Sequence, residues 1–225
     1  MKRKHRKTET ASAAEWFDAS IVDRKPSRLS GAIFAALCAL MIFSTLAYGA
    51  VDAWALGVLS CGAGVLALLW LADAFLNKEL RFSANPIQLP LVGLILIGLV
   101  QLLPLRGAGV SGDLLSIEPA RALTLNPAAT RLAIVQLVIH LVFFAAALAY
   151  VNTQKRLRAF VLVVIVFGCL MAFFGIIQQL ITTDTIYGFR QVPNAFPFGS
   201  FVNRHHFASF MVITAGLTQI GRAHV

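Results

Sequence analysis

The sequence predicts an all-α, polytopic transmembrane helix bundle, and its composition carries this prediction. Of the 225 residues, 58% are hydrophobic and only 13% are charged, and the mean hydropathy is +0.78. Soluble domains carry about 25% charged residues. The composition therefore excludes a soluble domain, a disordered chain and a nucleic-acid-binding module, and no nucleic-acid partner is expected.

Apolar runs of membrane-spanning length recur along the chain. The hydrocarbon core of a bilayer is about 30 Å thick, so a helix that crosses it needs about 20 apolar residues. Five complete spans are expected, and a truncated sixth begins near Phe207. The five runs cover residues 30–49, 53–76, 86–105, 131–151 and 158–182.

Polar residues mark where two of these helices begin. Asn85 precedes Pro86, and Asn126 precedes Pro127. An asparagine cap followed by proline at the first helical position is a typical helix start.

The first run follows a basic segment, as in a signal peptide, but that segment is too long and the cleavage site is poor. The first run is therefore interpreted as a span that is retained.

The distribution of basic residues predicts the orientation. Eight of the nineteen lysines and arginines fall within the first 28 residues. If the N-terminus is cytoplasmic, thirteen of the nineteen lie in cytoplasmic segments and five in outer segments, and positive residues stay on the cytoplasmic side. The loops at 106–130 and 183–206 then face outward. The predicted units are a basic cytoplasmic tail (1–29), the five-span bundle (30–182), and an extracytoplasmic loop with the start of the sixth span (183–219).

Few polar side chains are expected at membrane depth. Asp73 lies near the inner end of the second span, where its carboxylate reaches the headgroups. His140 lies near the middle of the fourth span, with Gln136 one turn earlier. An interhelical hydrogen bond is its expected role, because no other span offers a carboxylate at that depth. No cofactor or metal is expected, since the three cysteines lie in separate apolar runs without metal-ligand spacing. They are Cys38, Cys61 and Cys169.

Cationic side chains gather where the sixth run begins. Asn203 is expected to cap that helix, and Arg204, His205 and His206 follow it. Helix N-termini attract anions, and a guanidinium pairs bidentately with phosphate oxygens. We therefore expect an anion site at the outer leaflet, suited to a lipid diphosphate. The alternative is that Arg204 reaches lipid phosphates and the histidines merely lie at the interface. Arg190 either joins the site through the same loop or is a solvent-facing charge.

The segment Gly-Ser-Phe-Val-Asn-Arg-His-His-Phe-Ala at residues 199–208 resembles a motif of the O-antigen ligase and polymerase family. In that family the motif enters the conserved membrane domain. Two further segments, 46–54 and 125–131, resemble the family's N-terminal half. The resemblance implies a glycosyltransferase of the bacterial inner membrane. Its implied partners are membrane lipids, an undecaprenyl-diphosphate-linked glycan, and an acceptor at the periplasmic face, either lipid A–core or a growing polysaccharide.

The same resemblance implies roles for individual residues. Arg204 and His206 correspond to the family's arginine and histidine and are expected to bind substrate, with Asn203 as the preceding cap. His205 stands where the family commonly has a second asparagine. Arginines are expected to stabilise the leaving diphosphate while the acceptor hydroxyl attacks the anomeric carbon. The resemblance implies that the catalytic base lies in a large outer loop further along the chain than this sequence reaches. The catalytic residue is therefore unknown, and ligase and polymerase are not separated.

Two expectations concern the end of the chain and the alternative function. Residues 220–225 interrupt the sixth run with an arginine and a histidine, and codons for this hexapeptide resemble a common sequencing-adaptor sequence. These residues are excluded from the site, and the chain is expected to be an inactive fragment of a longer enzyme. The alternative is a non-enzymatic membrane subunit or a lipid-glycan transporter. A transporter should show inverted repeats or helices broken at mid-membrane, and the sequence shows neither.

Overall fold

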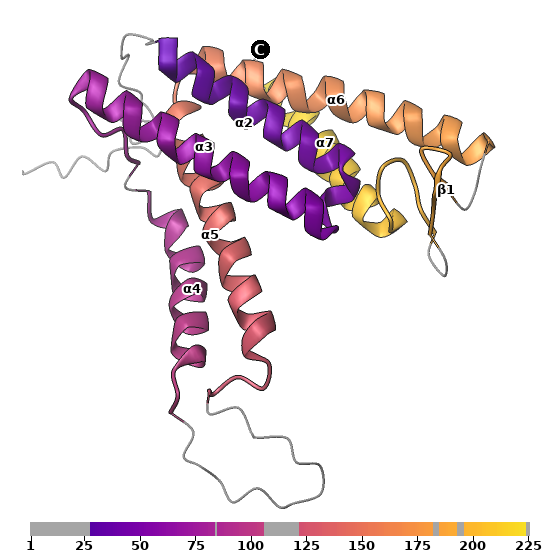
Figure 1. Ribbon diagram of the computed structural model, residues 1–225. Helices are drawn as coiled ribbons and strands as arrows, with labels where there is room; N and C mark the ends of the chain where they lie inside the picture. The colour runs from indigo at the N-terminus through magenta and orange to yellow at the C-terminus, as the bar shows by residue number, and fades with distance from the viewer. Residues whose placement is uncertain (1–27, 84, 106–121, 182–184, 193–195, 224–225) are drawn as a thin grey trace, which may run out of the picture.

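The computed structural model describes residues 28–83, 85–105, 122–181, 185–192 and 196–223, and these residues are mostly helical (Figure 1). The predicted basic tail before residue 28 and most of the loop at 106–130 lie outside the described residues. The helices are α2 (Arg28–Leu46), α3 (Ala53–Asn77), α4 (Leu89–Leu102), α5 (Pro127–Tyr150), α6 (Gln154–Ile181) and α7 (Arg204–Ala223). Two 3-10 turns, η1 (Tyr48–Ala50) and η2 (Pro86–Gln88), and two short strands, β1 (Thr185–Ile186) and β2 (Arg190–Gln191), complete the fold.

Four of the predicted spans are helices long and apolar enough to cross a membrane, namely α2, α3, α5 and α6. The third predicted span is shorter, because its regular helix ends at Leu102. Leu103 is extended, with φ −65° and ψ 140°, as expected for the residue before Pro104. The membrane character of the chain is thus supported by four helices, and the count of five complete spans stays a prediction.

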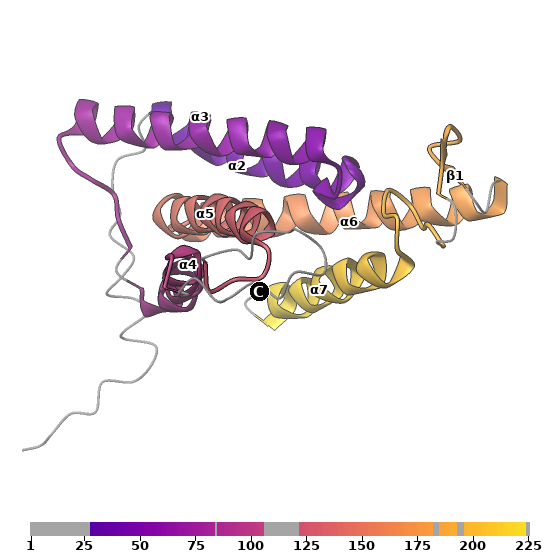
Figure 2. The same cartoon turned by 60° about the horizontal axis from the view of Figure 1, so that its bottom comes forward.

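The helices pack in layers rather than around one axis. In Figure 2, α2 and α3 lie above α5 and α6, and α4 and α7 lie below them. The buried core joins α2, α3 and the C-terminal half of α5, whereas the N-terminal half of α5 pairs with α4. The α4–α5 hairpin therefore runs away from α2, α3 and α6 (Figure 1). The core residues are Ile33, Leu37, Leu66, Ala146, Ala149 and Tyr150.

Helices approach most closely where a glycine faces a neighbouring side chain. A Cβ added at Gly62 would lie 2.4 Å from Leu40, and one added at Gly168 would lie 2.4 Å from Thr214. The first contact joins α3 to α2, and the second joins α6 to α7. Small residues at such positions allow close packing of transmembrane helices, so these glycines set the spacing of the two helix pairs.

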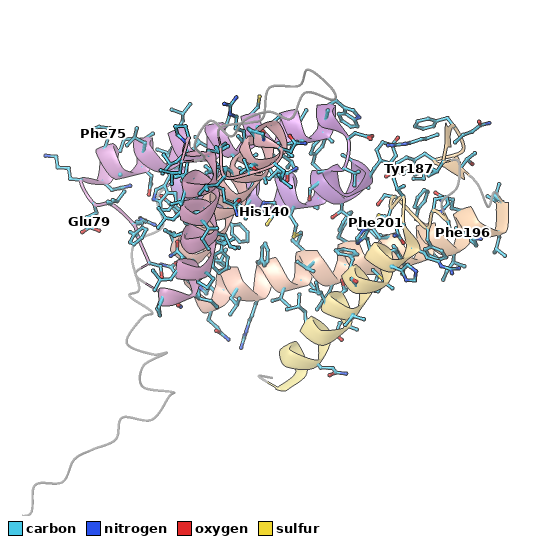
Figure 3. All side chains as sticks on the ribbon, turned by 90° about the horizontal axis from the view of Figure 1, so that it is seen from below. Phe75, Glu79, His140, Tyr187, Phe196 and Phe201 are labelled. Carbon is cyan, nitrogen blue, oxygen red and sulfur yellow. The ribbon has the colours of Figure 1, made fainter. Side chains whose placement is uncertain are left out.

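Hydrogen bonds between segments distant in the sequence place the interhelical connections at two opposite ends of the helices. At one end, the Tyr187 hydroxyl donates to the carbonyl of Leu46 at 2.7 Å, which joins the α2–α3 turn to the segment after α6. At the other end, the Arg156 guanidinium donates to the carbonyl of Tyr150 at 3.1 Å and also binds Ser30. Figure 3 shows Tyr187 far from Glu79, which follows α3. For these connections the grouping agrees with the two sides assigned from the sequence. The α4–α5 hairpin points to neither end, because it runs away from α2, α3 and α6 (Figure 1). The side that faces the cytoplasm stays a prediction.

Candidate functional site

The start of α7 is built as the sequence predicts. The Oδ1 atom of Asn203 accepts a hydrogen bond from the His205 amide at 2.9 Å, and the Asn203 carbonyl accepts one from the His206 amide at 3.0 Å. The Arg204 amide donates to the carbonyl of Phe196 at 3.1 Å. The first three amides of the helix are therefore partnered within the protein. An anion at this end would be held by side chains and by the helix dipole rather than by these amides.

The cationic side chains at this helix start are exposed. Arg204, His205 and His206 are all exposed, and the Arg204 guanidinium lies 5.1 Å from the ring centre of Phe196. This is within cation–π distance. Within the described part of the chain, no carboxylate lies within ion-pair distance of Arg204. The guanidinium thus packs on the Phe196 ring, and no described carboxylate is paired with it.

A cluster of phenylalanine rings carries this helix start. Phe198 and Phe201 exchange two backbone hydrogen bonds of 3.1 Å, and the ring of Phe207 lies 4.7 Å from that of Phe198. The Phe198 ring packs on α6 at Gly175, where an added Cβ would lie only 2.4 Å from it. Between the two phenylalanines, Gly199 has φ +60°, which favours glycine. The turn at residues 198–201 thus packs the start of α7 against α6.

The C-terminal end of α2 forms the second support. Ser200 is fully buried, and its hydroxyl donates to the carbonyl of Thr45 at 2.7 Å. Thr45 and Leu46 lie in the last turn of α2, where carbonyls lack intrahelical partners. Ser200 and Tyr187 supply the missing donors. The segment before α7 therefore caps α2, which explains why both segments lie at the same end.

Arg190 is engaged within the protein. Its guanidinium binds both carboxylate oxygens of Asp52, with 2.9 Å between the second nitrogen and Oδ1, and lies 4.0 Å from the ring centre of Tyr48. The hydrogen bond from Arg190 lowers the pKa of Asp52, and the bond to Asp52 raises that of Arg190. The predicted site residues thus separate: Asn203, Arg204 and His206 lie together at the start of α7, whereas Arg190 binds the α2–α3 turn.

A buried polar network at the opposite end was missed by the sequence reasoning. Asp73 is fully buried on α3; its carboxylate accepts from the Tyr150 hydroxyl at 2.9 Å and lies 3.3 Å from Nε of Arg81. The Trp70 indole donates to the carbonyl of Arg81 at 2.9 Å. The expectation that Asp73 reaches the headgroups is therefore wrong. The available signal was Arg81 itself, a cation eight residues after the aspartate.

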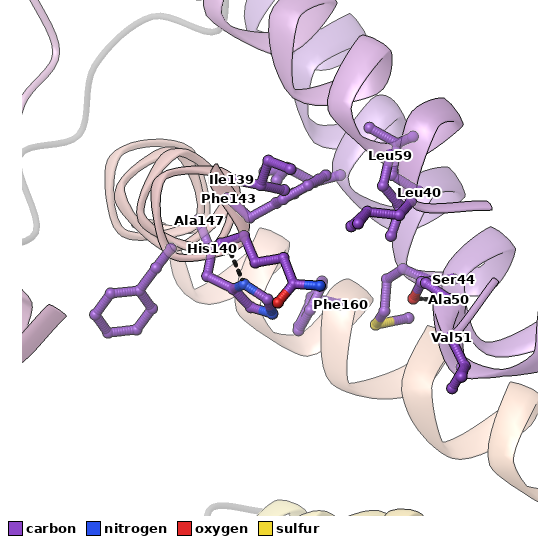
Figure 4. Close-up of a pocket in the computed structure, with 16 residues that line it drawn as sticks. Leu40, Ser44, Ala50, Val51, Leu59, Ile139, His140, Phe143, Ala147 and Phe160 are labelled. Carbon is purple, nitrogen blue, oxygen red and sulfur yellow. Dashed lines mark hydrogen bonds between the residues drawn. The ribbon is translucent and has the colours of Figure 1, made fainter. Parts of the chain in front are cut away.

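His140 lines a cavity of about 740 Å³ between the α2–α3 hairpin, α5 and α6 (Figure 4). The expected bond to another helix is not formed, because Nδ1 lies 2.5 Å from the carbonyl of Gln136 on the same helix. Ser44 and Gln136 are the other polar side chains of a lining that is otherwise apolar. The cavity extends to the α2–α3 turn at Gly49.

Comparison with known proteins adds no identification. No protein-family model, curated protein or solved structure matches this chain. The resemblance of residues 199–208 to the O-antigen ligase and polymerase family therefore stays a prediction.

Proposed function

We propose that this chain belongs to a glycosyltransferase of the O-antigen ligase or polymerase type. Such an enzyme sits in the bacterial inner membrane and transfers an undecaprenyl-diphosphate-linked glycan to lipid A–core or to a growing polysaccharide at the periplasmic face. The observation that carries the proposal is the exposed cluster of Arg204 and His206, which stands on an aromatic support at the start of α7. Four apolar helices of membrane-spanning length are consistent with a lipid-linked substrate.

The chemistry of this cluster suits a diphosphate that leaves. In glycosyl transfer the acceptor hydroxyl attacks the anomeric carbon, and the bond to the diphosphate oxygen breaks. Negative charge then develops on the diphosphate, and preorganised donors stabilise it. Arg204 offers a planar fork that matches two phosphate oxygens, and His206 lies two residues further on the same exposed turn. No described residue is assigned as the base that takes the acceptor's proton.

The proposal is tested by replacing Arg204 in the intact protein within its own cells. Arg204→Ala should abolish glycan transfer, seen as loss of the polysaccharide bands, while the protein still inserts into the membrane at its normal level. His206→Ala should impair transfer as well. The matched control is His205→Ala, an exposed neighbour on the same turn, which should matter less. A normal polysaccharide profile in Arg204→Ala would contradict the proposed anion site.

The cavity at His140 favours a second candidate, a non-enzymatic subunit or transporter for a lipid-linked glycan. Its apolar lining between helices can accept a lipid chain, and its polar side chains are few. In that case, substitutions at the cavity should stop translocation, whereas Arg204→Ala should leave it intact. A flipping assay in vesicles, with His140→Leu beside Arg204→Ala, separates the two candidates.

A further inference from the structure

The turn between α2 and α3 has an unusual backbone. Three consecutive residues, Tyr48, Gly49 and Ala50, have φ of 59°, 70° and 57°. Only glycine adopts this left-handed conformation without strain. A strained turn persists when surrounding contacts stabilise it, and such turns are common at functional sites. The residues that contact this turn are therefore candidates for a functional role.

The segment after α6 supplies those contacts. Two guanidinium nitrogens of Arg190 donate hydrogen bonds to the Asp52 carboxylate, and the guanidinium lies over the Tyr48 ring. Tyr187 packs on Tyr48 with ring centres 5.7 Å apart and donates to the Leu46 carbonyl. The β1–β2 hairpin, in which Ile186 pairs with Arg190, therefore lies against the strained turn.

The same turn also reaches the start of α7. An added Cβ at Gly49 would be in ordinary contact with the Phe201 ring, at 3.5 Å. The Phe201 ring in turn lies 6.0 Å from that of Phe207, one turn into α7. A short path of contacts thus runs from Asp52 through Phe201 and Phe207 to the helix start that carries Arg204.

We propose that Asp52 and Arg190 are positioning residues for the cluster of Arg204 and His206. The ion pair fixes the β1–β2 hairpin on the α2–α3 turn, and the turn fixes the aromatic support of α7. This inference rests on the proposed function, because it names the residues that place the proposed anion site. Arg190 then acts through Asp52 rather than on the ligand.

The solvent exposure of the Asp52–Arg190 pair indicates that it acts locally rather than on global stability. Arg190 and Asp52 keep side-chain exposures of 28% and 27%, and exposed pairs contribute little to global stability. The buried core around Tyr150 and Leu66 lies elsewhere. Breaking the pair should therefore loosen the hairpin and the approach to α7 while the helices stay packed.

The test uses the full-length protein in nanodiscs, with two readouts. The first is amide hydrogen exchange at residues 185–191 and 196–206, and the second is the affinity for inorganic diphosphate. Asp52→Ala and Arg190→Ala should each speed the exchange and weaken diphosphate binding by roughly tenfold, as expected for the loss of a charged hydrogen bond. The charge-swapped pair, Asp52→Arg with Arg190→Asp, should restore most of both. Arg158→Ala, an exposed arginine near the other end of α6, should change neither.

Three results would overturn the inference. They are unchanged exchange in both single variants, faster exchange with unchanged diphosphate affinity, and failure of the charge swap to restore binding. Arg204→Ala tests the proposed function separately, because it should abolish diphosphate binding without changing exchange at residues 185–191. Diphosphate binding that survives Arg204→Ala would count against the anion site, while the exchange data would still report on the ion pair.

Discussion

The Tyr150 hydroxyl, at the end of α5, donates a 2.9 Å hydrogen bond to the carboxylate of Asp73, which is fully buried on α3. Arg81, in the connection after α3, lies against the same carboxylate and over the Tyr150 ring. Arg156 binds the carbonyl of Tyr150. The buried carboxylate of α3 thus contacts α5 and the α3–α4 connection directly, whereas α6 reaches this network through Tyr150. Removing the carboxylate should therefore destabilise the packing of these segments.

We expect Asp73→Ala to destabilise the protein by about 3–5 kcal/mol, because it leaves Arg81 buried without its counter-charge. Tyr150→Phe should cost less, about 1.5–3 kcal/mol, since it removes a single hydrogen bond to a charged group. The matched control is Lys155→Ala, an exposed cation at the same end, which should change stability by less than about 0.5 kcal/mol. Thermal unfolding of the purified protein in one detergent measures all three. Equal midpoints for Asp73→Ala and Lys155→Ala would contradict the network.

A larger residue at Gly175 of α6 should clash with the Phe198 ring, which packs there just before α7. Gly175→Ala would place a methyl group 2.4 Å from the Phe198 ring and 3.4 Å from the backbone nitrogen of Gly199. The ring must move, at a cost of about 1–3 kcal/mol. Gly64→Ala is the control, because nothing lies within 4 Å of its added Cβ, and alanine in a helix should stabilise by about 0.5–1 kcal/mol. Unfolding midpoints should therefore move in opposite directions, and a rise in both would show that Phe198 does not pack on α6.

Local signals in the sequence were sufficient for several helix starts. Asn126 caps α5 by accepting from the Ala129 amide at 3.1 Å, Asn85 accepts from the Ile87 amide at 3.1 Å, and Asn203 caps α7. A cap depends on a side chain and on amides two or three residues away, so the local pattern contains it. The early end of α4 also has a local cause, since Leu103 precedes Pro104, but the predicted span ran past both residues to 105.

Long-range pairs could not be predicted in this way. Asp52 and Arg190 are 138 residues apart, and Tyr150 is 77 residues from Asp73. Each is a single charge or hydroxyl in an apolar chain, and nothing in its local pattern names a partner. For His140 the prediction of a partner on another helix was wrong, because its Nδ1 atom pairs with the Gln136 carbonyl of its own helix.

The ion pair of Asp52 and Arg190 predicts that attachment of the β1–β2 hairpin to the α2–α3 turn depends on pH. Its hydrogen bond lowers the pKa of Asp52 below the usual 3.8. A lowered pKa in the folded state means that the pair's contribution is fully present above the usual value. That contribution is lost as the pH falls through the lowered pKa. The hairpin should therefore stay attached between about pH 7 and 5 and loosen only below about pH 4.

A fluorophore on Phe189→Cys measures this attachment by its anisotropy, because Phe189 is 74% exposed beside the pair. The three native cysteines are first replaced by alanine. Asp52→Asn should give low anisotropy at every pH, because the uncharged asparagine side chain cannot form the ion pair with Arg190. Anisotropy that falls with acid in Asp52→Asn as well would assign the transition to another group.

The orientation in the membrane predicts which positions are reached from outside the cell. Val51 and Phe189 are exposed at the end that holds the α2–α3 turn, and Lys78 and Lys155 are exposed at the other end. From the excess of lysine and arginine, we expect the second end to lie in the cytoplasm. In a cysteine-free background, a membrane-impermeant maleimide on intact spheroplasts should label cysteines at 51 and 189. Cysteines at 78 and 155 should react only after the membrane is opened. The reverse pattern would place the N-terminus outside, and labelling of all four in sealed cells would mean that these helices do not cross the membrane.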